Sequence, residues 1–341
     1  MKNLSSRSYI TAVLVCTLGV VGVVYYYFFS NLSHQESTPY IYIDKDDTVD
    51  SVLNKLSDVS SSYGLDALRI LIRHSGYEEH VRTGRYAVEP GDCAFSLFRK
   101  LRNGSQEPIR LTIPEVRTME RLASVLGDKL MADSTSFINS FLDSGQCSLY
   151  GFTKETLPAL FIPNTYEVYW DVSVENLMSR LKKEHDDFWD NERLAKANAL
   201  GLTPDEVATL ASIIDEETSN ASEKPMVAGM YLNRLNEHMP LQADPTVKFA
   251  LKDFAARRIY HKMLTFDSPY NTYKYEGLPP GPIKIASVKG IDAVLNRTEH
   301  DYLYMCAKED FSGTHNFART YSEHLANASR YTRALNERGI H

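Results

Sequence analysis

Three consecutive acidic residues, Asp215, Glu216 and Glu217, end a segment whose apolar residues recur at helical spacing. The apolar stripe consists of Val207, Leu210, Ala211 and Ile214, with Ile213 beside it. At about 100° per residue, Glu217 falls about 20° around the helix axis from Leu210. Asp215 falls about 140° away, and Glu216 about 120° to the other side. The spacing therefore predicts that only Glu217 continues the buried face.

A carboxyl group at the end of an apolar stripe has its charged form disfavoured, so its pKa rises and it holds a proton near neutral pH. A general acid for glycosidic cleavage needs this property, which makes Glu217 the candidate catalytic residue. The alternative is structural: Glu217 bonds a neighbouring backbone amide or pairs with an arginine such as Arg234. The residue pattern alone leaves both interpretations open.

Signatures of other chemistries are absent from the sequence, which has no G-x-S-x-G, Walker, dinucleotide-binding or H-E-x-x-H motif. His315 and His324 are nine residues apart, which fits no standard metal-ligand spacing, so we expect no metal and no other cofactor. The four cysteines, Cys16, Cys93, Cys147 and Cys306, are too scattered for a disulfide framework. With 37 basic and 44 acidic residues, the composition argues against a nucleic-acid binder, which needs a basic surface, and leaves open only a local basic groove.

The helix that carries the candidate acid has a well-defined start. Thr203 and Glu206 form a capping box, and Pro204 suits the first helical position. Downstream, segments 267–273 and 277–283 are rich in proline and glycine, which excludes regular structure. An ordered loop of this length inside a compact domain is usually functional; the alternative is a proline-stiffened surface loop.

An apolar run from Tyr9 to Phe29 carries no charge over about the 20 residues that a helix needs to cross a bilayer. It predicts a single membrane-spanning helix in the inner (cytoplasmic) membrane. Lys2 and Arg7 precede the run and acidic residues follow it, so the positive-inside rule places the N-terminus in the cytoplasm. A cleaved signal peptide is the alternative, but the run is long and ends in aromatic residues instead of a small-residue cleavage site.

The remaining chain predicts an α+β protein. Strand patterns at 40–44 and 84–88 alternate with helical patterns at 48–56 and 94–101, and a strand follows at 109–113. Together they indicate a small α/β module.

Beyond this module, residues 116–199 are mainly helical, except that the proline in 160–170 predicts a loop. A short helix at 291–295, a strand at 301–305 and a polar helix at 321–338 follow. We divide the chain into a cytoplasmic tail (1–8), a membrane helix (9–29), a spacer (30–39), the small module (40–113), a helical connecting region (114–200) and a mixed α/β domain with the candidate acid (201–341).

Five segments in this order resemble the YceG/MltG family of membrane-anchored endolytic murein transglycosylases. They are Ala211–Thr218 (ASIIDEET), Val227–Leu235, Leu241–Val247, Ser268–Tyr273 and Gly277–Gly281. Each segment is weak alone, but their order and spacing are specific. In the family the catalytic glutamate is the last acid of A-S-I-I-E-K-E-T, a position that Glu217 holds here.

The resemblance also implies a glycan cleft and a binding module. The implied cleft residues are Asn233, Arg234, Gln242, Asp244, Tyr270, Asn271 and Tyr273. Residues 40–113 are expected to form a LysM-like peptidoglycan-binding fold. Three positions depart from the family pattern: Glu216 replaces Lys, Asn164 replaces Asp and Thr314 replaces Gly. None of them removes the proposed acid, but Thr314 leaves the role of His315 open.

The implied reaction cleaves the β-1,4 bond between N-acetylmuramic acid and N-acetylglucosamine within peptidoglycan strands, leaves 1,6-anhydro ends and terminates or trims nascent strands. Glu217 serves first as acid and then as base. Two rivals stay open: a glycoside hydrolase with Asp244 as second carboxylate, and a non-catalytic peptidoglycan-binding scaffold. Expected partners are peptidoglycan strands, the inner membrane, and peptidoglycan synthases or division proteins. An intact Glu217 argues against the scaffold.

Overall fold

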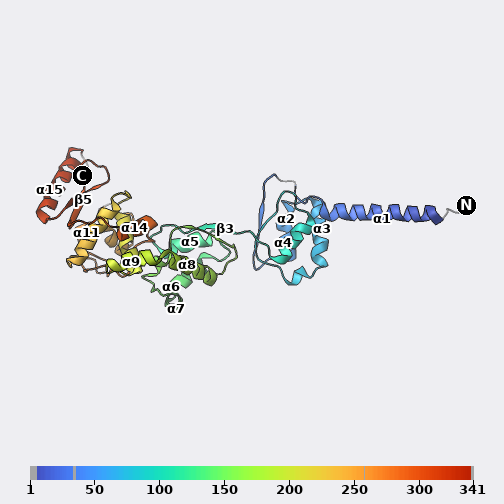
Figure 1. Ribbon diagram of the computed structural model, residues 1–341, viewed down its shortest axis with the longest axis horizontal. Helices are drawn as coiled ribbons and strands as arrows, with labels where there is room; N and C mark the ends of the chain where they lie inside the picture. Colours follow the sequence, from blue (N-terminus) through green and yellow to red (C-terminus); the bar gives the residue numbers. More distant parts are fainter. Residues whose placement is uncertain (1–5, 34–35, 257, 339–341) are drawn as a thin grey trace. The chain divides into compact units, whose positions relative to one another are not determined.

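The computed structural model of the protein describes residues 6–33, 36–256 and 258–338 (Figure 1). The chain forms two compact units. Unit 1 holds the described residues up to Arg110 together with 129–131 and 167–172, and unit 2 holds the others. Helices predominate, and the strands form two-stranded sheets, which confirms the mixed α/β class.

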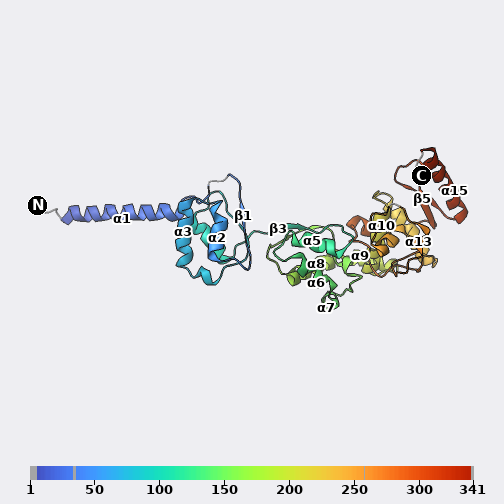
Figure 2. The same cartoon turned by 180° about the vertical axis from the view of Figure 1, so that it is seen from behind.

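Unit 1 begins with α1 (Ser6–Phe29), the one helix among the described residues that is long and apolar enough to cross a membrane. The unit continues with β1 (Tyr40–Ile43), α2 (Val49–Ser57), α3 (Ser62–Arg73), the 3-10 helix η1 (Tyr77–Glu79), β2 (Gly84–Ala87) and α4 (Ala94–Asn103). Strands β1 and β2 pair antiparallel, with Ile41 opposite Tyr86. Alternate residues of β1 are buried, so Ile41 and Ile43 join the core that α2, α3 and α4 complete (Figure 2).

The predicted strands and helices of the small module are confirmed to within two residues at each end. Helix α3 has no counterpart among the predicted elements, although Ala67, Leu68 and Ile72 recur at helical spacing and are buried. The segment predicted as a spacer includes Leu32, which is fully buried and whose amide donates to the Asp92 carbonyl at 2.6 Å. This part of the segment therefore belongs to the core of unit 1.

The chain passes from unit 1 to unit 2 within β3 (Ile109–Thr112) and from unit 2 back to unit 1 within β4 (Thr165–Val168), and these two strands pair in one sheet. The first part of unit 2 contains α5 (Met119–Gly127), α6 (Ser134–Leu142), α7 (Ser144–Leu149), the 3-10 helix η2 (Leu157–Leu160), α8 (Val174–Phe188) and α9 (Asn191–Ala199). The second part contains α10 (Pro204–Glu217), α11 (Lys224–Asn236), α12 (Asp244–Leu251), α13 (His261–Leu264), α14 (Val288–Leu295), β5 (Tyr304–Ala307), β6 (His315–Ala318) and α15 (Tyr321–Glu337).

The prediction of a loop over 160–170 is wrong for its second half, which forms β4. Pro163 precedes the strand instead of lying within it, so it removes no hydrogen bond from the ladder. Tyr166 and Val168 are buried while Thr165 and Glu167 are exposed, which is the period-two pattern of a strand.

Helix α10 is the centre of unit 2. Its capping box of Thr203 and Glu206 and its Pro204 start are confirmed. The eight residues 207–214 are all buried, because η2, α9, α11, α12 and α14 pack around the helix. A helix that is covered on all sides has no single buried stripe, so the prediction that only Glu217 continues a buried face is wrong. The Asp215 side chain is only 2% exposed.

The C-terminal part of unit 2 is a hairpin covered by a helix. Strands β5 and β6 pair antiparallel, with Met305 opposite Phe317, and α15 packs against both (Figure 1). The predicted C-terminal helix is confirmed to within one residue. The strand predicted at 301–305 begins only at Tyr304, and the helix predicted at 291–295 begins earlier, where Ser287 caps α14. Strand β6 has no predicted counterpart.

Candidate active site

Glu217 is the last residue of α10 and its side chain is partly buried. The hydroxyl of Tyr231, on α11, donates to Glu217 Oε1 at 2.8 Å. Burial raises the pKa of Glu217 to about 7; the Tyr231 hydrogen bond opposes this shift and the negative charge of Asp244 adds to it. Glu217 is therefore a carboxylic acid that holds and releases a proton near neutral pH.

Glu217 opens onto a cavity of about 240 Å³. The cavity is lined by Glu217, Met230, Tyr231, Arg234, Leu241, Gln242, Asp244, Tyr273, Met305, Cys306, Ala307 and His315. These residues come from α10, α11, the segment before α12, the loop before α14 and the β5–β6 hairpin. Four of the predicted cleft residues, Arg234, Gln242, Asp244 and Tyr273, thus lie together with the candidate acid.

Asp244 is the second carboxylate of this cavity. It begins α12, and its side chain is exposed. The Tyr273 hydroxyl donates to Asp244 Oδ1 at 2.6 Å, and burial together with this bond raises the pKa of Tyr273. The pair brings the 267–273 loop into the cavity, which supports the functional interpretation of that loop.

Arg234 and Gln242 shape the cavity wall. Arg234 is 7% exposed, and its guanidinium donates to the carbonyls of Leu303 at 2.6 Å and Leu241 at 2.8 Å. Among the described residues Arg234 forms no ion pair with Glu217, so the arginine partner of the structural alternative is absent from this site. Gln242 has a φ of 51°, a strained conformation for a residue with a side chain, and its exposed amide group stands at the cavity.

Three predicted cleft residues lie elsewhere. The Asn233 amide donates to the carbonyls of His300 at 2.7 Å and Tyr302 at 3.0 Å, so it fixes the segment before β5. Asn271 is fully buried and holds its own loop through backbone carbonyls. Tyr270 lines a different cavity. Asn233 and Asn271 thus position other parts of the site, while Tyr270 belongs to another surface.

A buried Glu223–His315 pair is a part of the site that the sequence analysis misses. Glu223 is 7% exposed and accepts hydrogen bonds from the His315 backbone amide at 2.6 Å and from the Thr218 hydroxyl at 3.0 Å. His315 Nδ1 lies 3.0 Å from Glu223 Oε2. The pair thereby ties β6 to the end of α10 and fixes the His315 ring at the cavity.

The two acids beside Glu217 face other partners. Asp215 pairs with Lys224 and accepts hydrogen bonds from Ser287, at 2.6 Å from its amide and 2.8 Å from its hydroxyl. Glu216 accepts a hydrogen bond from the Arg117 guanidinium at 2.7 Å. Neither residue lines the Glu217 cavity. Asp215 therefore joins α10 to α11 and α14, whereas Glu216 lies on another surface.

A protonated carboxyl group beside hydroxyl and amide groups in a polar cavity defines a general acid–base site for a polar substrate. No group of three His, Cys, Asp or Glu side chains that could hold a metal ion lies in 6–33, 36–256 or 258–338. The chain belongs to the YceG-like family, whose sequence profile matches residues 41–330. This match confirms the family that the order of the five segments indicates.

Relatives with assigned names share this chain's sequence over most of its length. It is 28% identical over 305 residues to a Bacillus subtilis (strain 168) protein named endolytic murein transglycosylase, which covers 84% of this chain and 82% of that protein. A protein of the same name from Streptococcus pneumoniae (serotype 2, strain D39) is 26% identical over 281 residues, which cover 74% of this chain. The match spans 51%, about half, of the pneumococcal protein.

A solved structure also matches the fold. The crystal structure of a yceG-like protein from Listeria monocytogenes superposes with a TM-score of 0.56 at 25% identity. The match covers 86% of this chain and 99% of that one.

Proposed function

We propose that the protein is an endolytic murein transglycosylase that cleaves the bond between N-acetylmuramic acid and N-acetylglucosamine inside peptidoglycan strands. The observation that carries the proposal is Glu217, whose pKa burial raises to about 7 in a cavity lined by hydroxyl, amide and carboxylate groups. The names of the B. subtilis and S. pneumoniae relatives support the substrate class. The site lies wholly within unit 2.

Glu217 acts in both halves of the reaction. It first gives its proton to the glycosidic oxygen as the bond to the muramic acid C1 breaks, which frees the 4-hydroxyl of N-acetylglucosamine. Its carboxylate then takes the proton of the muramic acid C6 hydroxyl while O6 bonds to C1, closing the 1,6-anhydro ring. The proton is returned and no water is consumed.

One carboxyl group suffices for this chemistry because the attacking hydroxyl belongs to the substrate itself, which supplies the proximity of the nucleophile. The Tyr231 hydroxyl occupies Oε1, so the transferred proton is carried by Oε2. The same hydrogen bond stabilises the carboxylate between the two halves of the reaction. The amide of Gln242 and the hydroxyl of Tyr273 offer partners for the N-acetyl and hydroxyl groups of the sugars.

A hydrolase is the second candidate, and the position of Asp244 favours it. Asp244 lines the same cavity, and its charge contributes to the raised pKa of Glu217. An exposed carboxylate in the same cavity as the acid would activate a water molecule in place of the C6 hydroxyl. The product would then carry a reducing end.

Mass spectrometry of peptidoglycan digested by the full chain in detergent tests the function. We expect internal fragments with 1,6-anhydro ends from the parent and from Glu216→Gln, and none from Glu217→Gln. Glu216 is the matched control because it is the adjacent acid and faces Arg117 outside the cavity. Equal losses of anhydro-ended fragments in both variants would contradict the assignment of Glu217 as the acid. No cleavage by the parent would favour a non-catalytic scaffold.

Asp244→Asn separates the two enzyme candidates. If the protein is a transglycosylase, the variant still yields anhydro ends, because Asp244 activates no nucleophile. If it is a hydrolase, the parent yields reducing ends and the variant loses them. The ratio of the two product types in parent and variant is the measurement.

We propose that α1 anchors the chain in the inner membrane with the N-terminus in the cytoplasm and both units outside. The uncharged span Ser8–Phe29 within α1, with Lys2 and Arg7 before it in the sequence, supports this orientation. Protease added to cells with a permeable outer layer should degrade both units. Protection of the chain until the membrane is opened would contradict the orientation. Peptidoglycan synthases and division proteins remain proposed partners of the anchored chain.

We propose that residues 40–113 form a LysM-like module that holds the enzyme on peptidoglycan. Its strand–helix–helix–strand order supports the proposal, and so does the exposed aromatic side chain of Tyr40 on β1, on whose ring the Arg85 guanidinium stacks 3.5 Å from the centroid. Tyr40→Ala in the Glu217→Gln background should lower co-sedimentation with insoluble peptidoglycan. Unchanged co-sedimentation would show that Tyr40 on β1 does not contribute to peptidoglycan binding.

A further inference from the structure

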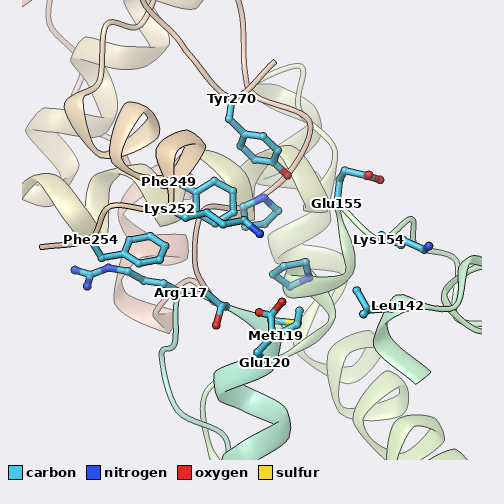
Figure 3. Close-up of a pocket in the computed structure, with 13 residues that line it drawn as sticks. Arg117, Met119, Glu120, Leu142, Lys154, Glu155, Phe249, Lys252, Phe254 and Tyr270 are labelled. Atoms are coloured by element: carbon cyan, nitrogen blue, oxygen red, sulfur yellow. The ribbon is translucent and has the colours of Figure 1, made fainter. Parts of the chain in front are cut away.

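A second cavity in unit 2 shares no lining residue with the Glu217 cavity. Its volume is about 290 Å³, and we call it the Tyr270 pocket (Figure 3). It is lined by Arg117, Thr118, Met119, Glu120, Leu142, Lys154, Glu155, Pro158, Phe249, Lys252, Phe254, Tyr270 and Pro282. The proposed reaction uses none of these residues.

The wall of the pocket is apolar. The rings of Phe249 and Tyr270 pack with their centroids 4.7 Å apart and form one side, while Met119 lies on the opposite side (Figure 3). Pro158 and Pro282 complete the lining. Rings and prolines lose little conformational entropy on binding, so this wall suits small apolar groups such as methyls.

The rim of the pocket carries charges of both signs. Lys154, Lys252, Glu120 and Glu155 have exposed side chains. In the part of the chain that the structure describes, none of the four forms an ion pair or a side-chain hydrogen bond. Figure 3 shows the Lys252 amino group directed into the pocket. Two cations and two anions without partners fit a ligand that itself bears carboxylates and an amine.

The wall is held in place by a close backbone contact. A Cβ atom on Gly281 would lie 2.0 Å from the Glu155 carbonyl oxygen, so only glycine permits the loop to approach the 155–156 segment. On the other side, the buried Asn271 side chain holds the turn that carries Tyr270. The pocket is thus built by the folded loop and does not depend on surface side chains alone.

Helix α12 connects the two cavities. Asp244, at its start, lines the Glu217 cavity, whereas Phe249 and Lys252, at its end, line the Tyr270 pocket. Eight helical residues span about 12 Å. A smaller hollow lined by Pro245, Lys248 and Phe249 lies along the same helix. For a group that branches from a strand bound at Glu217, the length of α12 sets the distance to the Tyr270 pocket.

We propose that the Tyr270 pocket binds the stem peptide that the lactyl group of muramic acid carries, an inference that rests on the proposed function. A stem peptide combines alanine methyl groups with carboxylates and, on its dibasic residue, an amine. The methyls match the apolar wall, the carboxylates match Lys252 and Lys154, and the amine matches the glutamates. The sugar strand itself is uncharged, so it would form no ion pair with any of these four side chains.

Two substrates that differ only in the stem peptide test the proposal. One is uncrosslinked glycan strands with their peptides, and the other is the same strands stripped by an amidase. For the full chain in detergent we expect a KM about fivefold lower on the peptide-bearing strands, as one partly exposed charged contact provides. Lys252→Gln should remove this difference and leave the KM on stripped strands unchanged.

Lys289→Gln is the matched control, because Lys289 is an exposed lysine on α14 that lines neither cavity. It should behave as the parent. Tyr270→Phe, which keeps the ring, should reduce the preference for peptide-bearing strands less than Lys252→Gln does. Equal KM values of the parent on both substrates, or an equal effect of Lys252→Gln on both, would overturn the pocket assignment. Cleavage of neither substrate would instead overturn the proposed function.

Discussion

Glu217 differs from its two acidic neighbours in the groups that its carboxyl contacts. Asp215 pairs with Lys224, and Glu216 accepts a hydrogen bond from Arg117, so each of these carboxylates has a cation to stabilise its charge. Glu217 accepts a bond from the neutral hydroxyl of Tyr231. A desolvated carboxyl group that lies against a neutral donor retains its proton to higher pH, which is the property that the proposed reaction needs.

The pH dependence of cleavage follows from the pKa of Glu217, which burial raises to about 7. The first step needs the protonated form, so kcat/KM should be high below pH 7 and fall as the pH rises through that value. The alkaline limb of a kcat/KM profile measures it. A limb near pH 4–5, where an ordinary glutamate titrates, would contradict the burial argument.

Tyr231→Phe should move this alkaline limb to higher pH. The hydroxyl stabilises the carboxylate form, so its removal raises the pKa of Glu217 further, by about one unit or less for one hydrogen bond. Asp244→Asn should move the limb in the opposite direction, because it removes a negative charge that raises the same pKa. The measurement is the kcat/KM–pH profile of each variant beside that of the parent. Shifts of the two alkaline limbs in the same direction would contradict these assignments.

The proposal that Glu217 is the acid follows from the sequence alone, but most of the partners that the structure gives Glu217 could not be predicted from it. The segment ASIIDEET fixes the position of Glu217 in the family pattern. Tyr231 lies three residues before Arg234, so the two share one face of α11. This spacing from a predicted cleft residue would have indicated Tyr231 as a residue of the site. Glu223 meets His315 across 92 residues of chain, a contact that no local pattern encodes. Such long-range pairs depend on the tertiary fold.

At the scale of elements, α10 is enclosed by its neighbours, and buried polar groups fix them at its end. The carboxylate of Asp215 accepts bonds from Lys224 of α11 and from Ser287, the cap of α14. A Cβ atom on Gly290 would lie 2.6 Å from this carboxylate, so α14 approaches as closely as glycine allows. The three helices thereby hold the acid and its partner Tyr231 in register.

Asp215→Asn should therefore destabilise the protein much more than Glu216→Gln. Removing one charge of a buried pair leaves Lys224 without its counter-ion, which costs about 3–5 kcal/mol. The partly exposed pair of Glu216 and Arg117 contributes about 1 kcal/mol or less. Thermal unfolding of the full chain in detergent compares the two variants. Equal losses of stability would show that Asp215 does not join the helices.

The elements themselves were largely predictable where local patterns decide them. Strand patterns located β1 and β2, helical patterns located α2 and α4, and the capping box located the start of α10. The proline of the 160–170 segment misled because its place at the edge of β4 depends on the pairing with β3. The short strand β6 forms only because β5 lies beside it, and a four-residue segment with one buried residue carries no clear period.

At the scale of the whole molecule, the last turn of the apolar helix α1 packs against the rest of unit 1. The Tyr26 ring stacks with Tyr63 of α3 at 6.5 Å between centroids, and Phe29 contacts Phe95 of α4 at 5.4 Å. Tyr27 and Phe28 pack against the core of unit 1. Aromatic residues favour the membrane interface, so we propose that the last turn of α1 serves both as an interfacial anchor and as part of unit 1.

Two truncations that differ by five residues test this double role. Deletion of residues 1–24 and deletion of residues 1–29 should both release the protein from the membrane fraction, because each removes most of the apolar span. The longer deletion also removes the two ring contacts and the packing of Tyr27 and Phe28 on the core, so unit 1 should lose at least about 2 kcal/mol of stability relative to the shorter deletion. Hydrogen exchange of α3 and α4 measures this difference within unit 1.

Cleavage of soluble strands at the Glu217 cavity should be equal in both truncated proteins, since that site lies in unit 2. Equal exchange in α3 and α4 would show that the aromatic turn belongs to the membrane alone.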